Sequence, residues 1–172
     1  MKFISGKLPL LLSLLLLTSN VFGEDFQVNE EAIITSVNSS NEWLSHGRTY
    51  DEQRFSELNQ ISTQNVDRLG IEWFADLDSN RGHEATPIVS DGVMFTTGAW
   101  SVVYAHDAIS GELLWKFDPK VPKEKAYFVC CDVVNRGVAI WEGKIFVGTL
   151  DGRLVALDAK TGKQLWQTNR DG

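Results

Sequence analysis

The chain has 172 residues, of which 43% are hydrophobic and 23% are charged, and its formal net charge is −7. This length suits one domain of ordinary size, and the composition is that of a globular protein. The negative charge argues against a nucleic-acid-binding surface, because such surfaces need clustered Lys and Arg side chains.

Residues 1–23 have the pattern of a secretory signal peptide. Lys2 and Lys7 provide a positive start, and the apolar run LPLLLSLLLL follows at 8–17. The alternative is a membrane anchor, but a stable membrane span needs roughly 20 apolar residues. We therefore expect an exported, periplasmic protein without a stable membrane span, in a compartment where disulfides persist.

The next segment, 24–70, is polar, and we interpret it as an N-terminal leader that lies across the main domain. Within it the sequence STQNVDRLG at 62–70 predicts a short helical turn. Ser62 or Thr63 is the expected cap, because a hydroxyl can accept a hydrogen bond from a free backbone N–H at a helix start.

An internal repeat follows the leader. The segment AHDAISGELLW at 105–115 aligns with ALDAKTGKQLW at 156–166, with six of eleven positions identical and a spacing of 51 residues. A weaker copy surrounds Trp73 and predicts a further outer strand there. In the second copy, Asp158 is expected to accept backbone hydrogen bonds within the turn, and Gly162 to supply its left-handed position. The tryptophans are interpreted as packing residues.

Each repeat contains four short β-rich runs separated by Gly next to Asp, Glu, Ser or Thr, which is typical of hairpin turns. The repeat length is near that of a propeller blade, about 40 to 50 residues. The sequence therefore predicts an all-β fold, with an incomplete β-propeller of four-stranded, tryptophan-bearing blades at 71–172. Only about two to three blades fit, whereas propellers close with about four to eight. We expect the chain to be the front part of a longer protein.

Two adjacent cysteines, Cys130 and Cys131, lie in the sequence YFVCCDVVNRG at 127–137. Neighbouring Cα atoms lie about 3.8 Å apart, whereas ordinary disulfides span about 4.4 to 6.8 Å, so a bond between them makes a tight and rare ring. The alternatives are buried reduced thiols, bridges to other chains or to residues missing from this sequence, and metal ligation, although two thiolates alone are a poor zinc site. Asp132 is interpreted as structural, and His83 as a surface histidine without a partner.

The sequences CCDVVNRG at 130–137 and RGHEATP at 81–87, together with the two repeats, resemble the quinoprotein alcohol dehydrogenases from about Trp43 to the end of the chain. That family consists of eight-bladed propellers holding pyrroloquinoline quinone (PQQ) and calcium. The resemblance implies cofactor-binding roles for four residues. A disulfide between Cys130 and Cys131 would stack on the planar quinone, Glu84 would contact its polar edge, and Arg136 would bind near its oxygens.

The resemblance also implies an activity: oxidation of small alcohols to aldehydes, with electrons passed to cytochrome c or a quinone. The catalytic aspartate and the calcium ligands are expected beyond Gly172, so no catalytic or metal-binding residue is assigned here, and the chain alone is expected to be inactive. A haem c domain could follow. One alternative is a non-catalytic propeller scaffold of the outer-membrane assembly type, which needs neither Cys-Cys nor Asn-Arg-Gly. A membrane-bound sugar-oxidising quinoprotein is the other, and would normally bring several membrane spans.

Overall fold

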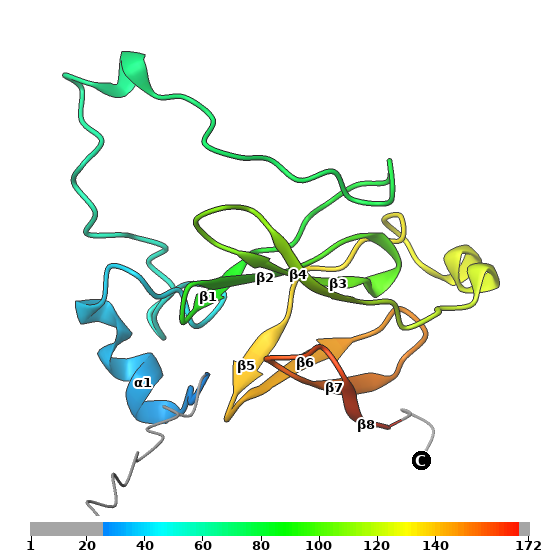
Figure 1. Ribbon diagram of the computed structural model, residues 1–172. Helices are drawn as coiled ribbons and strands as arrows, with labels where there is room; N and C mark the ends of the chain where they lie inside the picture. The colour runs from blue at the N-terminus through cyan, green and yellow to red at the C-terminus, as the bar shows by residue number, and fades with distance from the viewer. Residues whose placement is uncertain (1–25, 169–172) are drawn as a thin grey trace, which may run out of the picture.

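The computed structural model describes residues 26–168, and the predicted signal peptide at 1–23 lies outside them. Two four-stranded antiparallel sheets form its centre, each with its strands in consecutive order (Figure 1). The predicted all-β propeller fold is confirmed, with two complete blades. The first sheet consists of β1 Ile88–Ser90, β2 Val93–Thr97, β3 Val103–Asp107 and β4 Leu113–Phe117. The second consists of β5 Ala139–Trp141, β6 Lys144–Gly148, β7 Leu154–Asp158 and β8 Gln164–Thr168.

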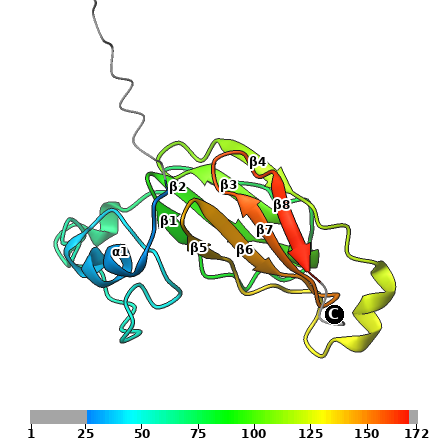
Figure 2. The ribbon, with the colours of Figure 1, turned by 90° about the horizontal axis from the view of Figure 1, so that it is seen from below.

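The two blades repeat the same register. Val93 pairs with Asp107 in the first sheet, and Lys144 pairs with Asp158 in the second. Both outer pairings shift at the same place, directly after Ala105 in β3 and directly after the corresponding alanine in β7. Figure 2 shows one sheet lying over the other, as neighbouring blades do.

The core lies between the sheets. Phe95 and Val103 from the first blade are fully buried, as are Ile145 and Val155 from the second. Complete burial of such a side chain stabilises the fold by about 1.5–3 kcal/mol. The partly buried Trp115 packs against this core and extends it toward the outer strands.

Trp115 also connects the first blade to the turn of the second. Its indole N–H donates to the carbonyl of Ala159 at 3.0 Å, and its ring lies directly over Gly162, which has a φ of +68°. Asp158 Oδ1 accepts the backbone N–H of Thr161 at 2.8 Å in the same turn. The packing role of Trp115 and the predicted turn are therefore both confirmed.

Trp73 repeats this arrangement one blade earlier. Its indole N–H donates to the carbonyl of Ala108 at 3.2 Å, and its ring lies over Gly111. The predicted outer strand around Trp73 is wrong for this structure, because the segment has no β pairing. A strand needs a hydrogen-bonded neighbour, and the described residues supply none for it.

The first part of the leader lies against both blades. The backbone N–H of Phe26 donates to the carboxylate of Asp91 at 2.6 Å, and the carbonyl of Val28 accepts the N–H of Glu142 at 2.8 Å. The leader contains α1 Glu30–Thr35 and the 3₁₀ turn η1 Ser36–Asn38. No helix within residues 26–168 is long and apolar enough to cross a membrane.

The second part of the leader runs away from the sheets and returns to them (Figure 1). It contains the 3₁₀ turn η2 Val66–Arg68, which confirms the predicted helical turn. The residue at the N-cap position is Asn65, which makes no side-chain cap hydrogen bond. The predicted Ser62 lies before the turn, where its hydroxyl accepts the N–H of Gln64 at 3.3 Å. The Asn65 carboxamide oxygen accepts the N–H of Ser62 at 2.7 Å, and the carbonyl of Ser62 accepts the N–H of Val66 at 3.0 Å, so Ser62 fixes the loop at the start of the turn.

Candidate functional site

The two segments that carry the site enter neighbouring blades at equivalent places. Residues 81–87 lead into β1, and residues 130–137 lead into β5. The backbone N–H of Thr86 donates to the carbonyl of Arg136 at 3.3 Å. At Gly137 the φ is +123°, and a Cβ there would lie 2.9 Å from the carbonyl oxygen of Thr86. The glycine therefore permits the close approach that places both segments side by side.

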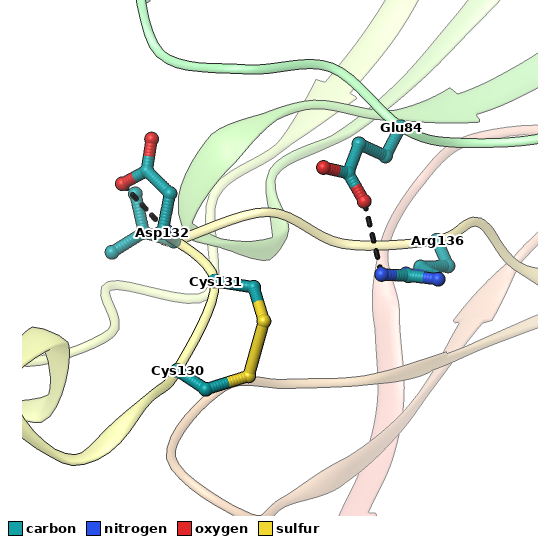
Figure 3. Close-up of a disulfide and its surroundings, with 6 residues drawn as sticks. Glu84, Cys130, Cys131, Asp132 and Arg136 are labelled. Carbon is teal, nitrogen blue, oxygen red and sulfur yellow. Dashed lines mark hydrogen bonds and ion pairs between the residues drawn. A yellow bond between two sulfur atoms is a disulfide. The ribbon is translucent and has the colours of Figure 1, made fainter.

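Cys130 and Cys131 are joined to each other in the structure, with their Cα atoms 3.8 Å apart. Both residues are exposed. Figure 3 shows the sulfur–sulfur bond on one side of the loop, pointing away from its backbone. The chain thus presents a small, polarisable disulfide face at this end of the blades.

Glu84 and Arg136 come together beside this loop. Glu84 Oε2 lies 3.1 Å from Arg136 Nη2, and the two side chains are 45% and 73% exposed. Figure 3 shows the carboxylate and the guanidinium facing each other. An arginine offers a planar set of N–H donors that suits carboxylate and quinone oxygens, and its exposure leaves several of these donors accessible.

A second ion pair was not foreseen from the sequence. The guanidinium of Arg81 forms a fork with the carboxylate of Asp132, and its Nε lies 2.9 Å from Oδ2. The hydrogen bond from Arg81, and after it the backbone N–H of Val133, lower the pKa of Asp132 from 3.8 to about 2. A carboxylate held so firmly as an anion is a poor proton acceptor near neutral pH. This agrees with the structural role expected for Asp132.

Asn135 fixes the end of the loop, and its role was also missed. Its Nδ2 donates to Ser101 Oγ at 3.1 Å and to the carbonyl of Gly148 at 2.8 Å, and its Oδ1 accepts the N–H of Gly137 at 3.1 Å. The site loop is thereby attached to both blades. The Asn-Arg-Gly sequence offered the only advance signal.

Two further findings complete the surroundings. His83 is exposed, as expected, but its Nε2 does have a neighbour, the carbonyl of Ser79 at 3.4 Å. A groove of about 470 Å³ lies on the same end of the first blade, lined in part by Trp100, Lys116 and Lys123. Among residues 26–168, no group of three or more His, Cys, Asp or Glu residues could hold a metal ion.

Comparisons with known proteins identify the family of the chain. Residues 43–172 match the PQQ family described as "Glucose/ethanol/alcohol dehydrogenase, beta-propeller domain". The chain is 60% identical over 139 residues to quinohemoprotein alcohol dehydrogenase ADH IIB of Pseudomonas putida, covering 81% of this chain and 20% of that protein. It is 57% identical over 135 residues to 1-butanol dehydrogenase (cytochrome c) of Thauera butanivorans, covering 78% and 20%.

A solved structure shows the same arrangement of strands. The solved structure of quinohemoprotein alcohol dehydrogenase ADHIIG from Pseudomonas putida HK5 matches with a TM-score of 0.82 and 55% identity, covering 85% of this chain and 21% of that one. The chain spans about a fifth of the length of the curated relatives it matches. On its sequence, its blades and this match, the chain belongs to the PQQ-type glucose/ethanol/alcohol dehydrogenase β-propeller family.

Proposed function

We propose that this chain is the N-terminal part of an exported, PQQ-dependent alcohol dehydrogenase and that it supplies one wall and one polar edge of the quinone site. One observation carries the proposal. The exposed Cys130–Cys131 disulfide and the Glu84–Arg136 ion pair lie on segments that enter adjacent blades side by side.

The side chains present fit the cofactor. PQQ is a flat anion with several carboxylates and an ortho-quinone, so its site needs a flat contact surface and cationic N–H donors. The disulfide offers the first, since both cysteines are exposed and their sulfurs point away from the backbone of the loop (Figure 3). The guanidinium of Arg136 offers the second.

Each residue has a distinct task in this proposal. The disulfide packs against one face of the ring system, excludes water from it and restricts its tilt. Arg136 donates hydrogen bonds to the oxygens at the ring edge, and Glu84 orients the guanidinium through the 3.1 Å contact. When bound, the quinone supplies the capacity to accept two electrons from the alcohol.

The remaining features of the reaction are part of the same proposal. A small alcohol is the substrate and an aldehyde is the product, because the relatives are named as alcohol dehydrogenases. Cytochrome c is the favoured electron acceptor, since one relative carries it in its name, and a quinone is the alternative. Calcium, the aspartate base and any haem c are assigned to parts of the protein outside this chain, and the chain alone is expected to be inactive.

The scaffold alternative gains no support from the site. A non-catalytic propeller has no need of an exposed disulfide beside an arginine, whereas both are present here. The relatives that share 57–60% identity are named as dehydrogenases.

The test uses the complete polypeptide that carries this chain, titrated with PQQ in the presence of calcium and assayed by dye-linked alcohol oxidation. We expect the Cys130→Ala, Cys131→Ala double variant to bind the quinone at least about tenfold more weakly, which corresponds to about 1.4 kcal/mol, with its circular dichroism unchanged. Arg136→Lys keeps the charge but loses the planar fork, so a smaller loss is expected. Lys120→Ala, which removes an exposed ion pair with Asp118, is the matched control.

Two outcomes would contradict the proposal in different ways. Unchanged affinity and activity in the double cysteine variant would remove the stacking role. Failure of the unaltered protein to bind the quinone at all would remove the dehydrogenase assignment and favour the scaffold.

A further inference from the structure

The residues before the disulfide are exposed, whereas the residue that anchors the chain after it is buried. The preceding residues belong to the 3₁₀ segment η4 Lys123–Phe128, and its last two side chains, Tyr127 and Phe128, are 88% and 83% exposed. The following Val133 is completely buried, and its carbonyl accepts the N–H of Trp100 at 2.8 Å. The orientation of the disulfide therefore depends on how the chain passes from the sulfurs to Val133.

Asp132 is the residue between the sulfurs and Val133, and its backbone adopts the left-handed conformation, with a φ of +70°. Aspartate is among the few non-glycine residues that adopt this region readily, because its short carboxylate can bond locally. Here Oδ1 accepts the N–H of the next residue, Val133, at 2.7 Å. The side chain thus stabilises the turn that directs the two cysteines outward.

The same carboxylate is held from outside by Arg81. The guanidinium donates from two nitrogens to the two oxygens, a fork that fixes direction as well as distance. Arg81 lies 51 residues earlier in the chain, at the start of the segment that carries Glu84. This fork consequently ties the disulfide loop to the segment that supplies the other half of the site.

We propose that Arg81 and Asp132 are positioning residues, whose fork sets the orientation of the Cys130–Cys131 ring relative to the Glu84 segment. The inference rests on the proposed function in one respect: the orientation of the ring matters because the ring contacts the quinone. The positioning itself concerns side chains of this chain alone and is measurable without cofactor.

The main variant is Asp132→Asn in the complete polypeptide. Asparagine retains the left-handed conformation and the local acceptor, so the turn survives while the charged fork is lost. Asp78→Asn is the matched control, because it removes another exposed aspartate ion pair on the first blade, which is formed with Lys116 and not with Arg81. Arg81→Gln removes the fork from the other side, and Arg81→Lys keeps the charge without the fork.

Three readouts separate positioning from stability. The first is the rate at which a phosphine reductant converts the disulfide into two thiols in cofactor-free protein, counted with a thiol reagent. The second is the affinity for PQQ and the absorption band of the bound quinone. The third is the melting temperature, which a purely structural role would lower in step with the first two.

We expect Asp132→Asn and Arg81→Gln each to speed reduction by about fivefold, to weaken quinone binding by a similar factor and to shift its absorption band, while the melting temperature stays near that of Asp78→Asn. The double variant should be no worse than either single variant, since both remove one interaction, and Arg81→Lys should lie between. Additive effects, or reduction rates equal to the control, would overturn the proposal. Faster reduction in a protein that binds no quinone would support the fork and overturn only the proposed function.

Discussion

Replacing Gly162 with alanine should disrupt the contact by which the first blade holds the second. An added Cβ would lie 2.5 Å from Cε3 of Trp115, within a rigid indole ring. Forcing extra atoms into a packed site costs about 1–3 kcal/mol, and losing the Trp115 hydrogen bond to Ala159 adds about 1 kcal/mol. A left-handed non-glycine residue adds roughly 1–2 kcal/mol. Together these contributions lower the unfolding free energy by about 3–6 kcal/mol.

Gly92→Ala is the control that isolates the conformational part. Its φ of +74° is nearly the same, but a Cβ there would meet nothing within 4 Å. It should cost only about 1–2 kcal/mol. Both variants are compared in the complete polypeptide by denaturant unfolding followed through tryptophan fluorescence. Equal losses in the two variants would show that the contact of Trp115 with the turn does not stabilise the pair of blades.

Three further perturbations test other parts of the structure. Arg48 is only 3% exposed, and its guanidinium donates to backbone carbonyls, including that of Phe55 at 2.6 Å. Arg48→Met should lower the unfolding free energy by about 3 kcal/mol or more, because several carbonyls lose their donor. Increased hydrogen exchange at 36–55 would report this loss. Asn135→Ala removes three hydrogen bonds and should cost about 2 kcal/mol, measured by the same unfolding assay; an unchanged midpoint would contradict its anchoring role. Burial raises the pKa of Glu42 above its usual 4.5, so the ionised carboxylate destabilises the fold as pH rises. Glu42→Gln should therefore raise the melting temperature at pH 7 but not at pH 4. An equal rise in melting temperature at both pH values would refute this.

The blades could be predicted because their signals are local. A glycine beside Asp, Glu, Ser or Thr marks each hairpin, and the turn that Asp158 stabilises is made by residues within a few positions of it. The disulfide involves adjacent residues, so the sequence alone shows that the two cysteines are close enough to be considered as a pair. Local chemistry of this kind does not depend on which distant segments later meet.

The rest of the site depends on such meetings. The Arg81–Asp132 fork joins residues 51 positions apart, and only the docking of two blades brings them together. The hydrogen bonds of Arg48 depend on a loop in which Arg48 itself has a φ of +73°, a conformation that composition does not reveal. The N-cap residue is Asn65 and not the predicted Ser62 or Thr63, because capping preferences do not distinguish these neighbouring residues, and the carboxamide of Asn65 bonds backward to the N–H of Ser62.

The repeat itself explains why the functional groups converge. In each blade the segment before the inner strand emerges at the same end of the sheet, and the two inner strands β1 and β5 belong to neighbouring blades. The residues just before these strands must therefore lie next to each other, and the backbone hydrogen bond from Thr86 to Arg136 joins them. Gly137 lets the two backbones approach to a distance that a side chain would prevent. A site made from equivalent positions of successive repeats needs no separate framework, because the packing of the blades already places a carboxylate, a guanidinium and a disulfide along one edge.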